Sequence, residues 1–188
     1  RNLPAGAQIF ALFVQYPQLA DLVGSVLVKA PALTQQLSQK PGLFDLLLNT
    51  EFFTPFTVDP LCLPSVAEHV TGAGGPEQAL NRLCLWASEE RFRVDVHLLQ
   101  GLCNVREASA RLSEIADICI CEITEMARLD MRRRYGQLPE EQFAVIGLGR
   151  LGSQQLTSVS DLDLMFVYDS PSNTRSDGQQ TLEAGRYY

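Results

Sequence analysis

The sequence predicts an α+β protein in which a mainly helical N-terminal part leads into the first strands of a sheet. Apolar residues recur at three- and four-residue steps up to about residue 135, which is typical of amphipathic helices. After "QLPEEQ" the period changes, and the apolar runs "FAVIG" and "DLDLMFVY" predict strands at about 143–147 and 161–168. Apolar residues make up 46% of the 188-residue chain and charged residues 20%, which is ordinary for a protein with a buried core.

The first 58 residues predict consecutive short helices. Pro17, Pro31 and Pro41 each stand before an apolar run, and proline fits the first turn of a helix but breaks its interior. A proline-rich connection, "TPFTVDPLCLP", follows, and "TGAGGPE" forms the clearest loop in the sequence. These signals divide the sequence into a helical first part, residues 1–75, and a second part, residues 76–188. The resemblance given below implies that the first is an inter-domain region and the second the N-terminal part of a further domain.

The second part opens with two long predicted helices, at 78–100 and at about 107–135. Trp86 lies on the apolar stripe of the first helix and is expected in the core. Gly136 suits the C-terminal cap of the second helix, because glycine readily adopts the left-handed conformation found there. The expected buried face of the second helix consists of Leu112, Ile115, Cys119, Ile123 and Met126.

Charge and cysteine usage argue against several function classes. A net charge of −7 does not favour a nucleic-acid or anionic-membrane partner. The most apolar stretch is broken by Pro17 and Asp21, short of the ~20 apolar residues of a membrane span. No basic-then-apolar leader follows Arg1, so we expect no signal peptide. The five cysteines form no CxxC pair, and with His69 and His97 they give no zinc spacing. We therefore expect reduced, buried thiols in a cytoplasmic protein.

The stretch "VIGLGRLGSQQLTSVSDLDLMFVYD" carries the candidate site and admits two functional interpretations. In the first, Gly147, Gly149 and Gly152 form a GxGxxG turn after a strand, and Asp169, 22 residues beyond Gly147, binds a ribose. This interpretation predicts an NAD-binding oxidoreductase of the Rossmann type with a helix across residues 153–162. Against it, that helix would end on two aspartates, at the negative end of its dipole.

In the second interpretation a strand begins at Asp161, so that Asp161 and Asp163 point to one face. The side chains of Leu162, Leu164 and Phe166 then point to the other face, into a core. Two carboxylates at this spacing suit Mg²⁺, which prefers a few carboxylates together with phosphate oxygens.

Small residues precede these aspartates. Gly152 and Ser153 would allow backbone N–H groups to approach a triphosphate closely, while Gly147 and Gly149 serve the turn and its tight packing. A purely structural alternative also stands. In it, the two aspartates only cap or solvate the end of the strand, and Ser160 forms the turn before them.

The same stretch resembles known nucleotidyltransferases. Gly-Ser followed after seven residues by Asp-Leu-Asp is similar to the signature of polymerase-β-like nucleotidyltransferases. The full run resembles the glutamine synthetase adenylyltransferases more closely, and the similarity extends over essentially the whole chain, most strongly from about Arg91. Gln155 departs from the usual Glu of that family, and Ser153 stands where Gly is common. The positions that match the motif are Gly147, Gly149, Arg150, Leu151, Gly152, Ser153, Leu156, Ser160, Asp161, Leu162, Asp163 and Leu164.

The resemblance implies a fold and a set of site residues. The strands would begin the mixed sheet of a polymerase-β-like nucleotidyltransferase, in the C-terminal, adenylylating half of the enzyme. Asp161 and Asp163 would be catalytic and bind Mg²⁺. The residues implied to bind ATP are Gly152, Ser153, Ser160 and Arg150.

The resemblance also implies an activity and partners. The enzyme would move AMP from ATP to a tyrosine of glutamine synthetase, regulating nitrogen assimilation, and its full length would also remove AMP by phosphorolysis. Glutamine synthetase would be its partner, with the PII signalling protein as a partner of the full-length enzyme. The family's third carboxylate lies on a later strand, so we expect it beyond Tyr188 and expect this piece alone to be inactive. A noncatalytic helical interaction segment remains the alternative.

Overall fold

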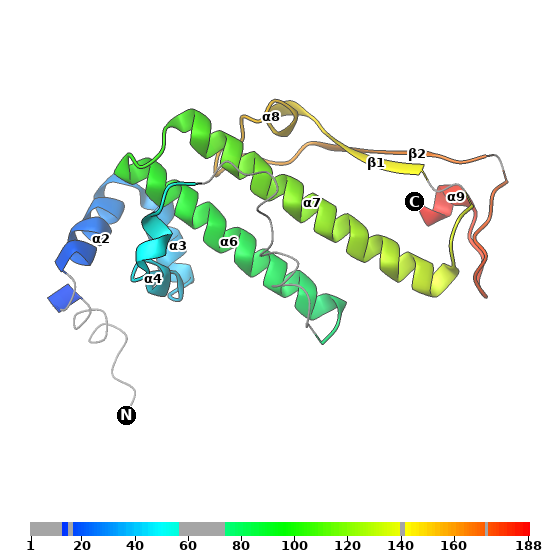
Figure 1. Ribbon diagram of the computed structural model, residues 1–188, viewed down its shortest axis with the longest axis horizontal. Helices are drawn as coiled ribbons and strands as arrows, with labels where there is room; N and C mark the ends of the chain where they lie inside the picture. The colour runs from blue at the N-terminus through cyan, green and yellow to red at the C-terminus, as the bar shows by residue number, and fades with distance from the viewer. Residues whose placement is uncertain (1–12, 15–16, 57–73, 140–141, 172) are drawn as a thin grey trace. The chain divides into compact units, whose positions relative to one another are not determined.

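The computed structural model describes residues 13–14, 17–56, 74–139, 142–171 and 173–188, and Figure 1 shows the order of their helices and strands. The chain divides into two compact units, described separately below. The first comprises Arg1–Asp59 and Ser88–Ala108, and the second comprises Pro60–Ala87 and Ser109–Tyr188. The combination of many helices with a small sheet confirms the α+β class. The predicted domain boundary near residue 75 stays a prediction.

Short helices build the core of the first unit. They are α2 (Pro17–Lys29), α3 (Pro31–Gln39), α4 (Leu43–Leu46) and the 3-10 helix η1 (Thr50–Phe53). Both α2 and α3 begin at the predicted proline, whose fixed φ suits a first helical turn. Their apolar side chains join residues of α6 (Pro76–Gln100) in one cluster. The buried members of this cluster are Leu22, Val23, Val26, Leu33, Leu37, Leu43, Leu47, Phe52, Phe92 and Val96.

Two side chains of α6 hold η1 in the first unit. Arg93 Nε donates a hydrogen bond to Phe52 O at 2.8 Å, and Arg93 Nη2 donates to Thr54 O at 2.9 Å. The fully buried His97 donates from Nε2 to the same Phe52 O at 2.6 Å. Because a carbonyl can only accept, Nε2 carries the proton, and Nδ1 has no hydrogen-bond partner among the described residues. Burial lowers the pKa of His97, so the neutral ring is favoured.

The two long helices lie within about two residues of their predicted bounds, because their apolar periodicity is strong. A reciprocal capping box starts α7 (Val105–Tyr135): Asn104 Oδ1 accepts from the N–H of Glu107 at 3.0 Å, and Glu107 Oε2 accepts from the N–H of Asn104 at 2.9 Å. The helix ends at Tyr135, and the next residue, Gly136, has a φ of 80° and is the predicted left-handed cap.

The buried face of α7 is shorter than the sequence predicts. Leu112 and Ile115 are buried, whereas Ile123 is 46% exposed, so its assignment to the buried face is wrong. Trp86 of α6 is buried, as predicted. Helical spacing shows which residues share a stripe, but neighbouring elements decide how far along the helix that stripe is covered.

The sheet of the second unit consists, among the described residues, of two strands. β1 (Gln142–Gly147) and β2 (Leu164–Asp169) pair antiparallel, with Gln142 opposite Asp169 and Gly147 opposite Leu164. The second strand was predicted to begin at Asp161, and it begins three residues later because regular pairing with β1 stops at Gly147.

The predicted burial of one face of β2 is wrong. Leu162 is 45% exposed and Phe166 is 64% exposed, while only Leu164 of the three is half-buried. Phe166 stacks on Phe143 of β1, with ring centroids 6.2 Å apart, but no described element covers it further. Alternation along a strand identifies which side chains share a face, and it does not tell whether a second layer covers that face.

The end of the chain packs onto the last turn of α7 in the second unit. Leu138, Ala184 and Tyr187 form a small core there, the last two from α9 (Ala184–Tyr187). Tyr187 Oη donates to Gly136 O at 2.9 Å, and the N–H of Gly178 donates to Tyr135 O at 3.0 Å. These bonds satisfy carbonyls at the helix terminus that have no partner within the helix.

Two further expectations concern membranes and thiols. Within the described residues, no helix combines the length and the apolarity that crossing a membrane requires. Cys84 and Cys121 are free and exposed, so the prediction of buried thiols is wrong for both. Cysteine is buried on average, but no neighbouring element covers these two side chains enough to bury them. Cys62 and His69 lie outside the described residues.

Candidate nucleotide and metal site

All predicted site residues lie in one connection, which runs from the end of β1 to the start of β2. The helical turn α8 (Gly149–Gly152) opens it, and an irregular loop leads on to Asp163. Its two ends are joined, because the N–H of Leu148 donates to Asp163 O at 2.8 Å. This bond continues the strand pairing by one step, so Asp163 is held beside the beginning of α8.

Three glycines allow the chain to fold back on itself here. A Cβ at Gly149 would lie 2.6 Å from Asp163 Oδ2, and φ of Gly149 is 52°, in the left-handed region. A Cβ at Gly152 would lie 2.6 Å from Gly147 O, and a Cβ at Gly147 would lie 2.9 Å from the side chain of Leu151. These contacts confirm that Gly147 and Gly149 serve the turn and its tight packing.

The backbone amides of Gly152 and Ser153 bond within α8. The N–H of Gly152 donates to Leu148 O at 3.0 Å, and the N–H of Ser153 donates to Gly149 O at 3.2 Å. Ser153 Oγ also donates to Gly149 O, at 3.1 Å. The pair therefore packs the turn in this structure, and its contact with a triphosphate stays a prediction.

A hydroxyl pair closes the turn that leads into the aspartates. Thr157 Oγ1 and Ser160 Oγ are 2.8 Å apart, the N–H of Thr157 donates to Ser160 Oγ at 3.0 Å, and the N–H of Ser160 donates to Thr157 O at 3.0 Å. Arg150 Nη1 of α8 reaches both hydroxyls, at 3.3 Å from Ser160 Oγ and 3.5 Å from Thr157 Oγ1. Ser160 thus forms the turn as the sequence indicated, and Arg150 connects that turn to α8.

Asp161 and Asp163 are both exposed and follow this turn directly. Among the described residues no group of three or more His, Cys, Asp or Glu side chains gathers as a potential metal site, so within this part of the chain no third such side chain joins the two aspartates. Hard divalent cations such as Mg²⁺ prefer carboxylate oxygens, and they retain water and phosphate oxygens as further ligands. Two exposed carboxylates beside a glycine-lined turn are a donor set that fits such an ion.

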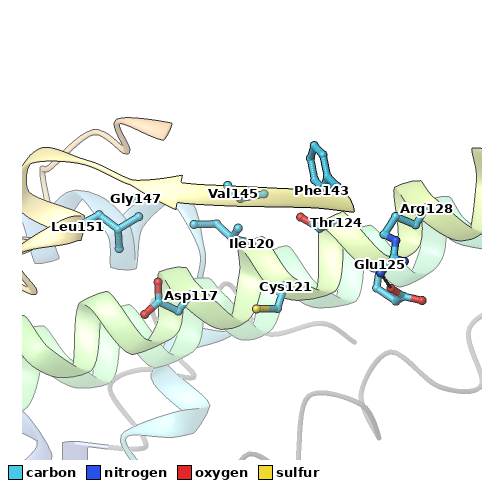
Figure 2. Close-up of a pocket in the computed structure, with 10 residues that line it drawn as sticks. All are labelled: Asp117, Ile120, Cys121, Thr124, Glu125, Arg128, Phe143, Val145, Gly147 and Leu151. Atoms are coloured by element: carbon cyan, nitrogen blue, oxygen red, sulfur yellow. Dashed lines mark hydrogen bonds and ion pairs between the residues drawn. The ribbon is translucent and has the colours of Figure 1, made fainter. Parts of the chain in front are cut away.

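A separate cavity of about 540 Å³ borders α7 and β1 in the second unit, as Figure 2 shows. Burial raises the pKa of Asp117 on its α7 side, and the neighbouring Glu114 raises it further. Gly147 and Leu151 line the cavity, whereas the predicted metal and nucleotide ligands do not. The cavity therefore touches the glycine turn at Gly147 and Leu151 and does not include the predicted site.

The residues that the sequence interpretation missed are Thr157 and Leu148. A Ser or Thr three residues before Ser160 is a recognisable signal for a side-chain-closed turn. The backbone bond from Leu148 had no signal in the sequence, since it depends on how two extended segments meet.

The antiparallel pairing rules out the dinucleotide interpretation. A Rossmann unit needs two parallel strands joined by a crossover helix, whereas β1 and β2 run antiparallel. The predicted helix across residues 153–162 is also absent from these residues, since α8 ends at Gly152 and an irregular loop follows. The NAD-binding oxidoreductase is therefore a wrong interpretation, and Asp169 pairs with Gln142 at the far end of the sheet.

Comparison with known proteins identifies the family. The family described as glutamate-ammonia ligase adenylyltransferase matches residues 20–188. The chain is also similar to proteins named bifunctional glutamine synthetase adenylyltransferase/adenylyl-removing enzyme. The protein from Rhizobium meliloti (strain 1021) is 33% identical over 188 residues. The proteins from Brucella melitensis biotype 1 and Agrobacterium fabrum (strain C58) are 31% identical over 189 residues and 30% identical over 188 residues. Each match covers 100% of this chain and 19% of the relative, so the chain spans about a fifth of the length of these curated relatives. With the match extending over most of its length, this chain belongs to the glutamate-ammonia ligase adenylyltransferase family.

Proposed function

We propose that this chain is part of an adenylyltransferase that moves AMP from ATP to a tyrosine of glutamine synthetase and so regulates nitrogen assimilation. The observation that carries the proposal is the position of Asp163, whose carboxylate lies against Gly149 in a glycine-rich turn inside the stretch that the family model matches. The names of the relatives supply the substrate protein and the second activity, adenylyl removal. We propose both for the full-length enzyme, in the cytoplasm, with PII as a regulatory partner.

The proposed fold extends the observed sheet. In a polymerase-β-like nucleotidyltransferase, β1 and β2 would be the first strands of a larger mixed sheet, and the connection between them would face the nucleotide. The exposed side chains of β2 support this, because Met165, Phe166 and Val167 are 44%, 64% and 42% exposed on a strand of this length. Apolar side chains exposed to this extent are typical of a surface that another segment covers.

The chemistry required of the site is an in-line displacement at the α-phosphorus of ATP. A bond forms between the tyrosine oxygen and the α-phosphorus, and the bond from that phosphorus to pyrophosphate breaks. The O–H bond of the tyrosine breaks as well, and its proton passes to a base of the full-length enzyme or to water. Bound Mg²⁺ would supply positive charge that neutralises the phosphates and orients them. Asp161 and Asp163 would provide its carboxylate ligands, because both are exposed and are the only two acids of the loop.

The rest of the connection positions these groups. Gly149, Gly152 and Ser153 keep α8 compact against the loop. Arg150 contacts the turn hydroxyls through Nη1, and a guanidinium has five N–H donors in all, so others remain for phosphate oxygens. Asp169 is the last residue of β2, at the end of the strand that lies away from the site loop, which makes it a suitable control position.

The test follows the transfer of label from α-labelled ATP to glutamine synthetase by the full-length enzyme in the presence of Mg²⁺. We expect Asp161→Asn and Asp163→Asn each to reduce transfer by roughly 100-fold or more, the scale expected when a group that stabilises transition-state charge is removed. The control Asp169→Asn keeps wild-type transfer. A folded Asp161→Asn enzyme with wild-type transfer would show that these carboxylates do not form the metal site.

A further inference from the structure

The turn from Thr157 to Ser160 is closed by three hydrogen bonds between these two residues. Backbone and side chain of Thr157 both take part: its N–H and its Oγ1 meet Ser160 Oγ, and its C=O accepts the N–H of Ser160. The residue next in the chain is Asp161. The backbone direction at Asp161 is therefore set by this turn, and not by the strand, which begins only at Leu164.

Counting donors and acceptors assigns the direction of the hydroxyl bond. A serine hydroxyl has one donor and two acceptor lone pairs. Ser160 Oγ accepts from the N–H of Thr157 at 3.0 Å and from Arg150 Nη1 at 3.3 Å, so both lone pairs are occupied. Its own O–H therefore donates to Thr157 Oγ1 at 2.8 Å. The hydrogen-bonding capacity of Ser160 is filled within the protein, which makes it a structural group of the turn.

The two aspartates are consequently held by two independent connections. Asp163 is fixed by the backbone bond from Leu148 and lies against Gly149. Asp161 directly follows Ser160, and Ser160 depends on Thr157 within the turn and on Arg150 for its link to α8. Losing the acceptor at Thr157 Oγ1 would leave the Ser160 O–H without its partner and would loosen Asp161 while leaving Asp163 in place.

We propose that Thr157 is a positioning residue, whose hydroxyl fixes the turn that presents Asp161 to the metal-bound nucleotide. This inference rests on the proposed function, in which Asp161 binds Mg²⁺. Thr157 acts through Ser160 and touches neither substrate nor metal. Its loss therefore weakens metal binding by allowing the carboxylate to occupy other positions, without removing any ligand.

The test compares four variants of the full-length enzyme. Thr157→Val removes the hydroxyl and keeps the shape, and Thr157→Ser retains the hydroxyl. Val159→Ala changes a side chain in the same turn that is 82% exposed and serves as the matched control. Asp161→Asn removes the proposed ligand itself. Mn²⁺ binding in the presence of ATP, followed by electron paramagnetic resonance, and the Mg²⁺ concentration for half-maximal AMP transfer are measured for each, with the unfolding temperature as a check on folding.

We expect Thr157→Val to weaken Mn²⁺ binding and to raise the half-saturating Mg²⁺ concentration by about fivefold, the scale of one lost hydrogen bond. At saturating Mg²⁺, kcat and the unfolding temperature stay close to wild type. Thr157→Ser and Val159→Ala both keep the wild-type metal dependence.

Each other result has a distinct meaning. Wild-type metal dependence in Thr157→Val, together with loss of Mn²⁺ binding in Asp161→Asn, overturns the positioning role and leaves the proposed function standing. Equal loss in Thr157→Val and Thr157→Ser also overturns it, because the hydroxyl is then not the operative group. Wild-type Mn²⁺ binding in Asp161→Asn overturns the proposed function and the positioning role together.

Discussion

The carboxylate of Asp163 lies against the α-carbon of Gly149, so that a Cβ added at Gly149 would stand 2.6 Å from Asp163 Oδ2. Two separate features favour glycine at this position. The first is the close approach of Asp163, and the second is the φ of 52°, which costs energy for any residue that has a Cβ. The atom that an added Cβ would meet is the free end of a side chain, which can rotate away. Stability and function therefore respond differently to a change here.

We expect Gly149→Ala to destabilise the local structure by only about 1 kcal/mol, the cost of a left-handed alanine, yet to reduce AMP transfer far more, by displacing Asp163. The comparison is Gly101→Ala, where φ is 70° and an added Cβ meets nothing within 4 Å. Opening free energies from amide hydrogen exchange and AMP transfer by the full-length enzyme provide the two readouts. Equal transfer in both variants would contradict the role assigned to Gly149.

The second prediction concerns Gly136 and the stability of the packing at the end of α7. A Cβ at Gly136 would overlap the backbone nitrogen of Gly178 and Asp177 Oδ1, and φ of Gly136 is 80°. Backbone atoms cannot rotate away, so the loop at Asp177 must leave the end of α7. We expect Gly136→Ala to cost about 2 to 4 kcal/mol, against about 1 kcal/mol for Gly101→Ala. Hydrogen exchange at the last turn of α7 measures the difference, and equal costs would show that the packing against Gly178 is unimportant.

The third prediction concerns pH and His97. Burial lowers the pKa of this ring, Arg93 lowers it further, and the bond to Phe52 O and the charge of Glu90 oppose the shift. A pKa that is lower in the folded than in the unfolded state means that the unfolded state binds the proton more readily. The stability that His97 contributes is thus complete above its unfolded pKa of about 6.5 and is lost as the pH falls below it.

We expect the unfolding temperature of the wild type to fall between pH 7.5 and pH 5.5 by more than that of His97→Gln, which retains a donor for Phe52 O but does not titrate. The only other histidine in the sequence, His69, provides the control. His69→Gln keeps the wild-type pH response if His97 is responsible. A wild-type response in His97→Gln would assign the effect to another group.

Particular residues show how far sequence reasoning reached. Pro17 and Pro31 marked helix starts and Gly136 marked a helix end, because these residues act through local backbone geometry that needs no knowledge of neighbours. Gly147 and Gly149 were likewise assigned to a tight turn, as the structure confirms. The reciprocal bonds of Asn104 and Glu107 could have been predicted from their spacing, and they place the start of α7 two residues earlier than the apolar pattern did.

The remaining features depended on tertiary contacts that no local pattern encodes. The alternation in "DLDLMFVY" put Phe166 in a core, although no described element covers it. The same alternation began the strand at Asp161, because it is indifferent to where pairing with β1 stops. At the site, the aspartates could be selected by residue type, whereas the approach of Asp163 to Gly149 depends on how two chain segments cross.

The open edges of the two-stranded ribbon have a consequence for handling this segment in isolation. Strand β2 reads LMFVYD, a run with one charge and no proline or glycine, and in the described residues it pairs on one side only. An unpaired, flat, apolar edge is a template for further strands, and six-residue segments of this composition stack readily into cross-β fibrils. A preparation limited to these 188 residues should therefore form ordered aggregates on storage, because Asp169 is the one charge that keeps neighbouring copies of β2 apart.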